Sequence, residues 1–286
     1  MVEHGNGNRN PGDRGQRQHG SSLHRDTTLL ASTYEKTSVH HIEHGKRLVD
    51  ALSIAEGDCV LDIGAGTGHL AAHVAELVGS SGYVVAMDPL PLRIEFAKSK
   101  TGANFEACVG RAEDLSQFPD EAFNVVYLNS VFHWVEDKPR ALAEIFRVLS
   151  PDGRLGITCP DAARPHEAFQ FIRRGLKDVG GEHKRAVARS DLLTDYELEK
   201  LMGAAGFASY ESGSWTFANV YPDVETLLES VESASFGNFL VDSTDRFHAQ
   251  LLDALDRLLE SRRRDDGSIE LERYLMFAKA RKPKSL

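Results

Sequence analysis

Short apolar segments alternate with stretches of helical periodicity in the middle of the chain. Five segments are nearly continuous in hydrophobic residues: 59–64, 83–88, 104–110, 123–130 and 154–159. Such segments are typical of strands that a parallel sheet buries on both faces. Between them, Leu70, Val74 and Leu77 recur at helical spacing, and Asp137 stands where a helix over 137–149 needs an N-cap. The alternation predicts an α/β fold with a doubly wound, mostly parallel sheet.

The flanking regions carry different patterns. Residues 1–26 are almost entirely polar or glycine, and they are predicted to form a disordered tail because they cannot bury a core. Residues 27–54 have apolar positions at helical spacing and are predicted to be a helical lid ahead of an α/β core at 55–160. Residues 161–286 are expected to complete the same domain with a substrate-cap insertion, edge strands and helices.

Local patterns add detail to the last region. The sequence "SPDG" (150–153) predicts a turn. A charged helical stretch is expected within 161–190, and further helices over 195–207 and 245–264. The segments 208–221 and 272–282 are expected to be strands that pair antiparallel at one edge of the sheet.

Composition and charge limit the partners and ligands. The chain has 286 residues and a net charge of −10, so a nucleic-acid partner is not expected. No apolar segment approaches the roughly 20 residues that span a bilayer, which predicts no membrane span. Cys59, Cys108 and Cys159 have no zinc-site or disulfide spacing, and they are expected to be buried free thiols in a reducing, cytoplasmic protein. The chain is expected to be a monomer or a homodimer.

A histidine cluster precedes the first predicted strand. His40 and His44 are four residues apart, with His41 beside them, but no third ligand is evident. They are expected to belong to a packed or solvated helix, and no metal site is predicted.

A glycine-rich turn, "VLDIGAGTGHL" (60–70), follows the first predicted strand. It lacks the Gly-Lys-Ser/Thr of a triphosphate-binding loop, and His69 stands where a dinucleotide-binding turn has its third glycine. Asp62 would repel a pyrophosphate but can attract an ammonium group. Asp88, which closes the second strand, can accept hydrogen bonds from both hydroxyls of a ribose. These two carboxylates predict a ligand with a cationic end and a ribose, and S-adenosylmethionine has both.

Four segments of the chain also favour S-adenosylmethionine as the ligand: "VLDIGAGTG" (60–68), "VVAMD" (84–88), "GRAEDLSQFPDEAFNVVYLNS" (110–130) and "RALAEIFRVLSPDGRLGI" (140–157). Through them the chain resembles the class I S-adenosylmethionine-dependent methyltransferases from about Tyr34 to Cys159. It is similar above all to the small-molecule branch that includes the quinone-biosynthesis and trans-aconitate enzymes. The resemblance implies a seven-stranded Rossmann-like sheet and S-adenosyl-L-methionine as the cofactor.

The resemblance also assigns residues. It implies cofactor contacts from Tyr34, Asp62, Gly64, Ala65, Gly66, Asp88, Pro89, Ala112, Glu113, Asn129 and Ser130. Arg111 departs from the family, which has an acceptor for the adenine amine there, whereas arginine only donates. Glu113 or a backbone carbonyl is expected to replace that contact.

The acceptor side is less specific. His133 and Trp134 follow the fourth strand at the edge where ligands of such sheets bind, and both are candidates for the substrate site together with Tyr34. His133 is the candidate catalytic residue, as a general base or a hydrogen-bond donor; the alternative is that it caps a loop while Trp134 packs. Trp215, Phe217 and Phe236 either shape the pocket or belong to the core.

The "F-x-W" segment at 132–134 resembles methyltransferases of small carboxylic acids. This resemblance favours a small-molecule acceptor that is O-methylated on a carboxylate or hydroxyl. Three alternatives stay open: a methyltransferase-like binding protein with weak catalysis, a nicotinamide-dependent oxidoreductase and a metalloid methyltransferase. Ser130 argues against the last, since arsenic methyltransferases have a cysteine at that position.

Overall fold

A seven-stranded sheet forms the centre of the computed structural model, which describes residues 23–180, 192–240 and 243–284. The strands lie in the order β3-β2-β1-β4-β5-β7-β6. Their bounds are β1 Cys59–Ile63, β2 Tyr83–Asp88, β3 Phe105–Val109, β4 Phe123–Asn129, β5 Leu149–Pro160, β6 Ala208–Tyr221 and β7 Ile269–Arg281. Neighbours among β1 to β5 pair in parallel, whereas β7 runs antiparallel to both β5 and β6. The predicted mostly parallel sheet with an antiparallel edge is confirmed.

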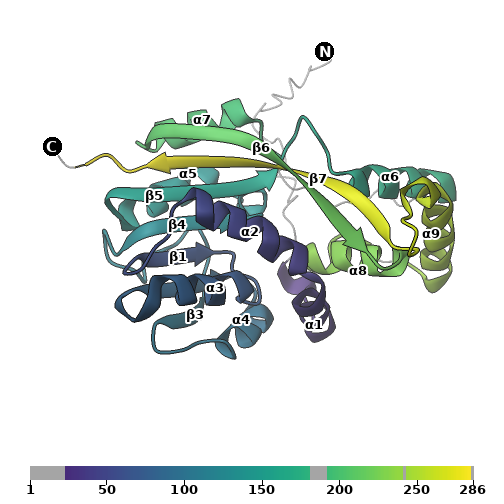
Figure 1. Cartoon of the computed structure of the whole chain (residues 1–286), viewed down its shortest axis with the longest axis horizontal. Helices are drawn as coiled ribbons and strands as arrows, with labels where there is room; N and C mark the ends of the chain where they lie inside the picture. The colour runs from purple at the N-terminus through teal and green to yellow at the C-terminus, as the bar shows by residue number, and fades with distance from the viewer. Residues whose placement is uncertain (1–22, 181–191, 241–242, 285–286) are drawn as a thin grey trace, which may run out of the picture.

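Helices cover both faces of this sheet (Figure 1). Their bounds are α1 Thr28–Thr37, α2 Val39–Ala51, α3 His69–Val78, α4 Pro91–Lys98, α5 Lys138–Val148, α6 Glu167–Val179, α7 Asp195–Ala204, α8 Val224–Ala234 and α9 Asp245–Leu258. Successive residues of β1 point to opposite faces of the sheet. Val60 packs in one core cluster with Val74 of α3, and Leu61 packs in another with Ile145 of α5. This two-sided burial explains the continuous apolar strands in the sequence. Across the described ranges, no helix has the length and apolar character that crossing a membrane requires.

The two C-terminal strands are longer than the sheet they complete. β5 pairs with β7 only from Leu275 to Arg281, while β6 continues to pair with β7 back to Ile269. Figure 1 shows the free halves of β6 and β7 running past β5 toward α6, α8 and α9. These helices bury a third apolar cluster against the two strands, with Ile172, Leu227 and Leu251 among its members. The free halves of β6 and β7, together with α6, α8 and α9, therefore form a cap beyond the carboxyl ends of the parallel strands.

Several local predictions need correction. The helical pattern over 26–52 forms two helices, α1 and α2, which meet at Ser38. The predicted turn at 150–153 belongs to β5, where Asp152 adopts a left-handed φ of 63° and its N–H donates to the carbonyl of Lys282. This hydrogen bond lets β5 include residues 150–153, because Lys282, just after β7, supplies the acceptor. A local sequence pattern cannot predict a partner that is so distant in the chain.

The ends of two predicted segments lie outside the described residues. Residues 1–22 of the predicted tail are among them, but Leu23–Arg25 form a 3-10 turn and Asp26 contacts Arg93 at 3.4 Å. Residues 23–26, which the prediction placed in the disordered tail, therefore have a defined structure. Within 161–190, α6 covers Glu167–Val179, and 181–190 is not described.

The glycine turn joins β1 to α3 through left-handed backbone. Gly64, Gly66 and Gly68 have φ of 76°, 57° and 81°, which side chains with a Cβ adopt only with strain. The N–H groups of Gly64 and Ala65 both donate to the carbonyl of Met87 in β2, at 2.7 and 3.0 Å. A Cβ on Gly64 would lie 2.3 Å from Cγ2 of Val131. Conformation and crowding together require glycine at this position.

Gly64→Ala should lower the free energy of unfolding by about 2–4 kcal/mol, because it adds backbone strain and overpacking at one site. Gly203→Ala is a matched control, since Gly203 lies in α7 with nothing within 4 Å of an added Cβ. It should raise the free energy of unfolding by up to about 1 kcal/mol, because alanine favours helix. Urea denaturation measures both values, and a Gly64→Ala protein as stable as the wild type would contradict this account of the turn.

Candidate active site

A cavity of about 420 Å³ opens at the carboxyl ends of the parallel strands, the usual place for ligands of such sheets. Its lining comes from two parts of the fold. The sheet contributes the glycine turn, the end of β2 and the loops after β3 and β4, whereas α1, α6, α8 and β7 contribute the remaining wall. One cavity thus touches the residues predicted for the cofactor and those predicted for the acceptor.

Asp88 is the buried carboxylate at the centre of the first group. Its Oδ2 accepts from the N–H of Gly66 at 2.9 Å, and its Oδ1 accepts from the N–H of Leu90 at 2.9 Å. An ionised carboxylate offers about four acceptor positions, so both oxygens can accept a further donor from the cavity. Burial raises the pKa of Asp88, while the Arg93 guanidinium opposes that shift.

Asp62 lies nearby on β1, next to β2 in the sheet. It borders a side recess of about 30 Å³ together with Ala65, Thr67 and Asn129. The hydroxyl of Tyr127 donates to its Oδ2 at 2.8 Å. Burial raises the pKa of Asp62 to about 7, and the hydrogen bond from Tyr127 counteracts part of this rise. A cationic group in the recess would favour the ionised carboxylate.

The loop after β3 forms another wall, where Ala112 and Glu113 line the cavity with Arg111. The Arg111 guanidinium lies 3.6 Å from the carboxylate of Glu113 and 3.7 Å from that of Glu136. Glu113 also accepts from the N–H of Glu136 at 3.0 Å. Arg111 is therefore ion-paired at the rim of the cavity, and the Glu113 carboxylate already accepts a hydrogen bond. The backbone carbonyls of this loop are therefore the better candidates to accept a hydrogen bond from a ligand.

Asn129 and Ser130 end β4 at the floor of the cavity. The amide of Asn129 donates to the carbonyl of His41 at 2.8 Å and accepts from the hydroxyl of Thr158 at 2.8 Å. Ser130 has a left-handed φ of 59°, and its N–H donates to the carbonyl of Thr158 at 3.0 Å. This network fixes α2 against the ends of β4 and β5.

The lid helix α1 is attached directly to the glycine turn. The Glu35 carboxylate contacts Lys100 and His69, each at 2.9 Å. Tyr34, one residue earlier, lies beside Gly66, and a Cβ on that glycine would be 2.9 Å from its ring. The guanidinium of Arg93 lies 4.3 Å from the centre of the Tyr34 ring. Tyr34 borders both the main cavity and the recess beside Asp62.

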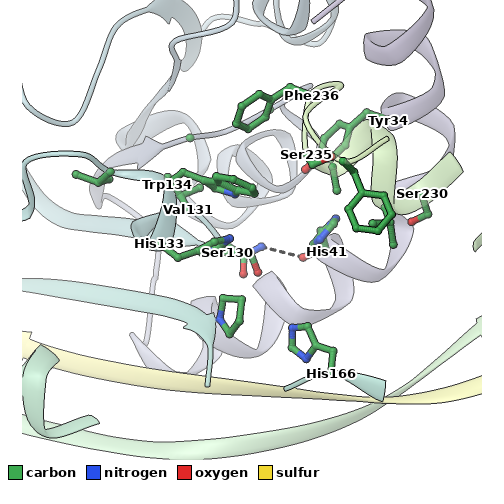
Figure 2. A pocket seen from close by; sticks show the side chains of 18 of the residues that line it. Tyr34, His41, Ser130, Val131, His133, Trp134, His166, Ser230, Ser235 and Phe236 are labelled. Atoms are coloured by element: carbon green, nitrogen blue, oxygen red, sulfur yellow. Dashed lines mark hydrogen bonds between the residues drawn. The ribbon is translucent and has the colours of Figure 1, made fainter. Parts of the chain in front are cut away.

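His133 and Trp134 lie on the acceptor side, in a 3-10 turn after β4. His133 is buried, and burial lowers its pKa to about 3, with smaller contributions from the charges of Arg273 and Lys138. Its ring is therefore neutral near pH 7. Trp134 lines the cavity and also packs edge-on against Phe236, with ring centres 5.0 Å apart. Figure 2 shows the two aromatic rings together with His133, His41 and His166 around one space.

The other residues singled out from the sequence have structural roles. Phe236 lines the cavity, whereas Trp215 stacks on Phe277 in the core and Phe217 packs against His44. His40 and His44 contact the carbonyl of Val220 and the amide of Asn219 on β6, at 3.1 and 3.2 Å. They form part of a packed helix, and the described ranges contain no group of residues suited to a metal ion.

The three predicted free thiols are indeed unpaired. Cys159 is buried, whereas Cys59 and Cys108 are half-buried. Several cavity residues were not predicted from the sequence, among them Arg93, His166 and Arg273. Arg93 follows Asp88 by five residues and His166 follows the segment 140–157 by nine, but no local pattern marks either as a cavity residue. Arg273 carries a faint signal, as a charge at the start of an apolar strand, but that signal is equally typical of a solvated strand end.

Known proteins with similar sequences identify the family. Residues 61–157 match the family model described as a methyltransferase domain. The ubiquinone/menaquinone biosynthesis C-methyltransferase of Cronobacter sakazakii is 37% identical over 199 residues, which cover 66% of this chain and 70% of that enzyme. The enzyme of the same name from Francisella philomiragia is 36% identical over 116 residues, 38% of this chain and 46% of that protein. The chain therefore spans less than half of some of these relatives.

A solved structure supports the fold. The YcgJ protein from Bacillus subtilis superimposes with a TM-score of 0.58 and 20% identity, covering 86% of this chain and 99% of that one. Sequence match, sheet order and the cavity beside the glycine turn agree with one another. The chain belongs to the class I S-adenosylmethionine-dependent methyltransferases, and within them it resembles the quinone-biosynthesis type.

Proposed function

We propose that this protein transfers a methyl group from S-adenosyl-L-methionine to a small molecule bound in the same cavity. One observation carries the proposal: Asp62 near the end of β1 and Asp88 at the end of the adjacent β2 flank the glycine turn. Asp62 borders the small recess, and the cavity lined by Asp88 continues to His133 and Phe236. A ligand with an ammonium group and a ribose fits the first part. The second part leaves room for an acceptor.

The residues present fit this cofactor. Asp88 has unused acceptor positions for the ribose hydroxyls, and Gly64 and Gly66 both line the cavity beside it. Asp62 would hold the ammonium group in the recess. Ala112 and Glu113 would border the adenine, and Asn129 and Ser130 would face the reacting end. A pyrophosphate beside buried Asp62 would be repelled, which disfavours the nicotinamide alternative.

The cofactor supplies an electrophilic methyl group and a neutral thioether as leaving group. Asp62 and Asp88 would hold the cofactor so that its methyl group faces the acceptor half of the cavity. The protein's contribution is to align the two molecules and to exclude water. Tyr34 and the ion pairs of Glu35 would hold the lid over the reacting groups.

Whether carbon or oxygen is methylated depends on the chemical class of the acceptor. The relatives named above are C-methyltransferases, whereas the "F-x-W" segment led to the expectation of O-methylation. Both reactions can start from an oxyanion, since a carboxylate attacks through oxygen and a phenolate through oxygen or a ring carbon. We favour such an acceptor because a neutral His133 can donate a hydrogen bond to it without removing a proton.

Incubation with methyl-labelled cofactor and a panel of benzoic acids, phenols and hydroquinones tests the proposal. Label should pass to at least one member, and mass spectrometry would show whether oxygen or carbon carries it. A protein that binds neither S-adenosylmethionine nor S-adenosylhomocysteine in calorimetry would contradict the proposed function. Cofactor binding without transfer to any acceptor would favour the methyltransferase-like binding protein instead.

Asp88→Ala should weaken S-adenosylhomocysteine binding by roughly 100-fold, because each hydrogen bond to a charged group contributes about 1.5–3 kcal/mol. Asp253→Ala, which removes an exposed carboxylate on α9, should leave the affinity unchanged. Calorimetry measures the affinities, and thermal unfolding checks that Asp88→Ala is folded. Wild-type affinity in the Asp88→Ala protein would exclude the ribose assignment.

S-adenosylhomocysteine affinity should fall as the pH is lowered from 7 toward 5, by up to roughly tenfold per unit. The reason is that Asp62, with a pKa of about 7, becomes protonated and loses its attraction for the ammonium group. The Asp62→Asn variant should bind weakly with a flat profile over that range. Binding titrations at a series of pH values test this prediction. If the affinity of Asp62→Asn depended on pH as steeply as that of the wild type, a group other than Asp62 would be the one that is protonated.

His133→Phe should reduce methyl transfer by roughly 10- to 100-fold while cofactor affinity stays the same, because the ring borders the acceptor rather than the ribose. The wild-type rate should show no titration of His133 between pH 6 and 8, since its pKa lies near 3. His248→Phe on α9 serves as the control. A sigmoidal rise in rate near pH 7 that His133→Phe abolishes would restore His133 as a general base.

A further inference from the structure

Arg273 is a cation in the cavity wall that forms few hydrogen bonds with the described residues. It lies on β7 opposite Phe217 of β6, two residues before the pairing with β5 begins at Leu275. This position sets it just beyond the carboxyl ends of the parallel strands, and its side chain lines the cavity. A guanidinium has five N–H donors. Among the described residues one contact accepts from it, the hydroxyl of Ser130 at 3.5 Å from Nη2, and its buried Nε has no partner.

The other enclosed arginines are paired with carboxylates. Arg154 lies 2.6 Å from Asp58, and Arg93 lies 3.4 Å from Asp26 and donates to the carbonyl of Ser233 at 2.6 Å. Arg273 forms no ion pair with any described carboxylate. Burial lowers the pKa of Arg273. Arg273 is half-buried and faces the cavity, with its Nε buried, so an anion bound in the cavity would supply the counter-ion that this cation lacks.

The groups around Arg273 are neutral imidazoles. His41, His133 and His166 all line the cavity, and burial together with the charge of Arg273 lowers the pKa of each ring. Each ring also has one buried nitrogen without a hydrogen-bond partner in the described structure. The rings therefore add hydrogen-bonding capacity around the cation without adding negative charge.

His166 shows which of its nitrogens donates. Its Nδ1 lies 3.2 Å from the backbone N–H of Tyr274 and accepts from it. The proton of a neutral ring must then be on Nε2, and this nitrogen is the unpartnered one. The strand that carries Arg273 thus also fixes His166 as a second donor at the same wall (Figure 2).

We propose that the methyl acceptor carries an oxyanion, a carboxylate or a phenolate, which Arg273 pairs with and the Nε2–H of His166 helps to bind. This inference rests on the proposed function and specifies its substrate class. The wall near His166 is aromatic, since Phe169 stacks beside it with ring centres 6.0 Å apart and Phe239 packs against Phe169, so the rest of the acceptor is apolar. Since Arg273 lies 3.5 Å from Ser130 at the end of β4, the anion binds beside the site of methyl transfer.

A second source of a carboxylate is the amino-acid end of the cofactor itself. The two sources predict different behaviour of Arg273→Met. If the acceptor supplies the anion, S-adenosylhomocysteine affinity is the same in the variant and the wild type. If the cofactor supplies it, that affinity falls, and the inference is wrong.

The probes are acetate and benzoate, each compared with its neutral amide, acetamide and benzamide. They are titrated by calorimetry into protein saturated with S-adenosylhomocysteine. In the wild type, the anionic member of at least one pair should bind more tightly by roughly tenfold or more. Arg273→Met should abolish that preference, Arg273→Lys should keep part of it, and Arg281→Gln at the exposed end of β7 should keep all of it.

Folding of the key variant is measured separately. Arg273→Met should unfold at the same temperature as the wild type or higher, because it removes an unpaired charge and keeps the apolar length of the side chain. No preference for the anion in either pair, or a preference that survives in Arg273→Met, would overturn the inference. Failure of the wild type to bind S-adenosylhomocysteine at all would instead contradict the proposed function.

Discussion

The carboxylate of Asp88 is the interaction on which the site depends. It ends β2 and accepts from the N–H of Gly66 on one side and of Leu90 on the other. It thereby fixes the glycine turn after β1 relative to the start of α4. The same two oxygens keep unused acceptor positions toward the cavity. A residue that shapes the turn is thus also the one proposed to hold the ribose, and substitutions there act on both.

The acceptor half of the cavity has a different origin. It exists because β6 and β7 continue past β5 and carry α6, α8 and α9 with them. The lid helices α1 and α2 close the remaining side through contacts of Glu35 and Asn129. A shared methyltransferase core can therefore keep its cofactor chemistry while the cap, which shows no family motif, determines the acceptor.

The core was predictable because its signals are local. Continuous apolar strands, the glycine turn and the strand-end carboxylates Asp62 and Asp88 are each legible within a few residues. Arg273 and His166 could not be assigned in this way, since they are more than 100 residues apart and meet because β7 pairs with β5, whose end leads into His166. The lowered pKa of His133 could not be predicted either, because it depends on burial and on Arg273, neither of which the sequence displays.

A crystal structure with S-adenosylhomocysteine tests the central claim most directly. The account predicts both ribose hydroxyls within hydrogen-bond distance of Asp88 and the amino group beside Asp62. It also predicts that Arg273 and His166 remain free of the ligand, facing the space left for an acceptor. A ligand bound elsewhere in the cavity, or one whose ribose does not contact Asp88, would contradict it.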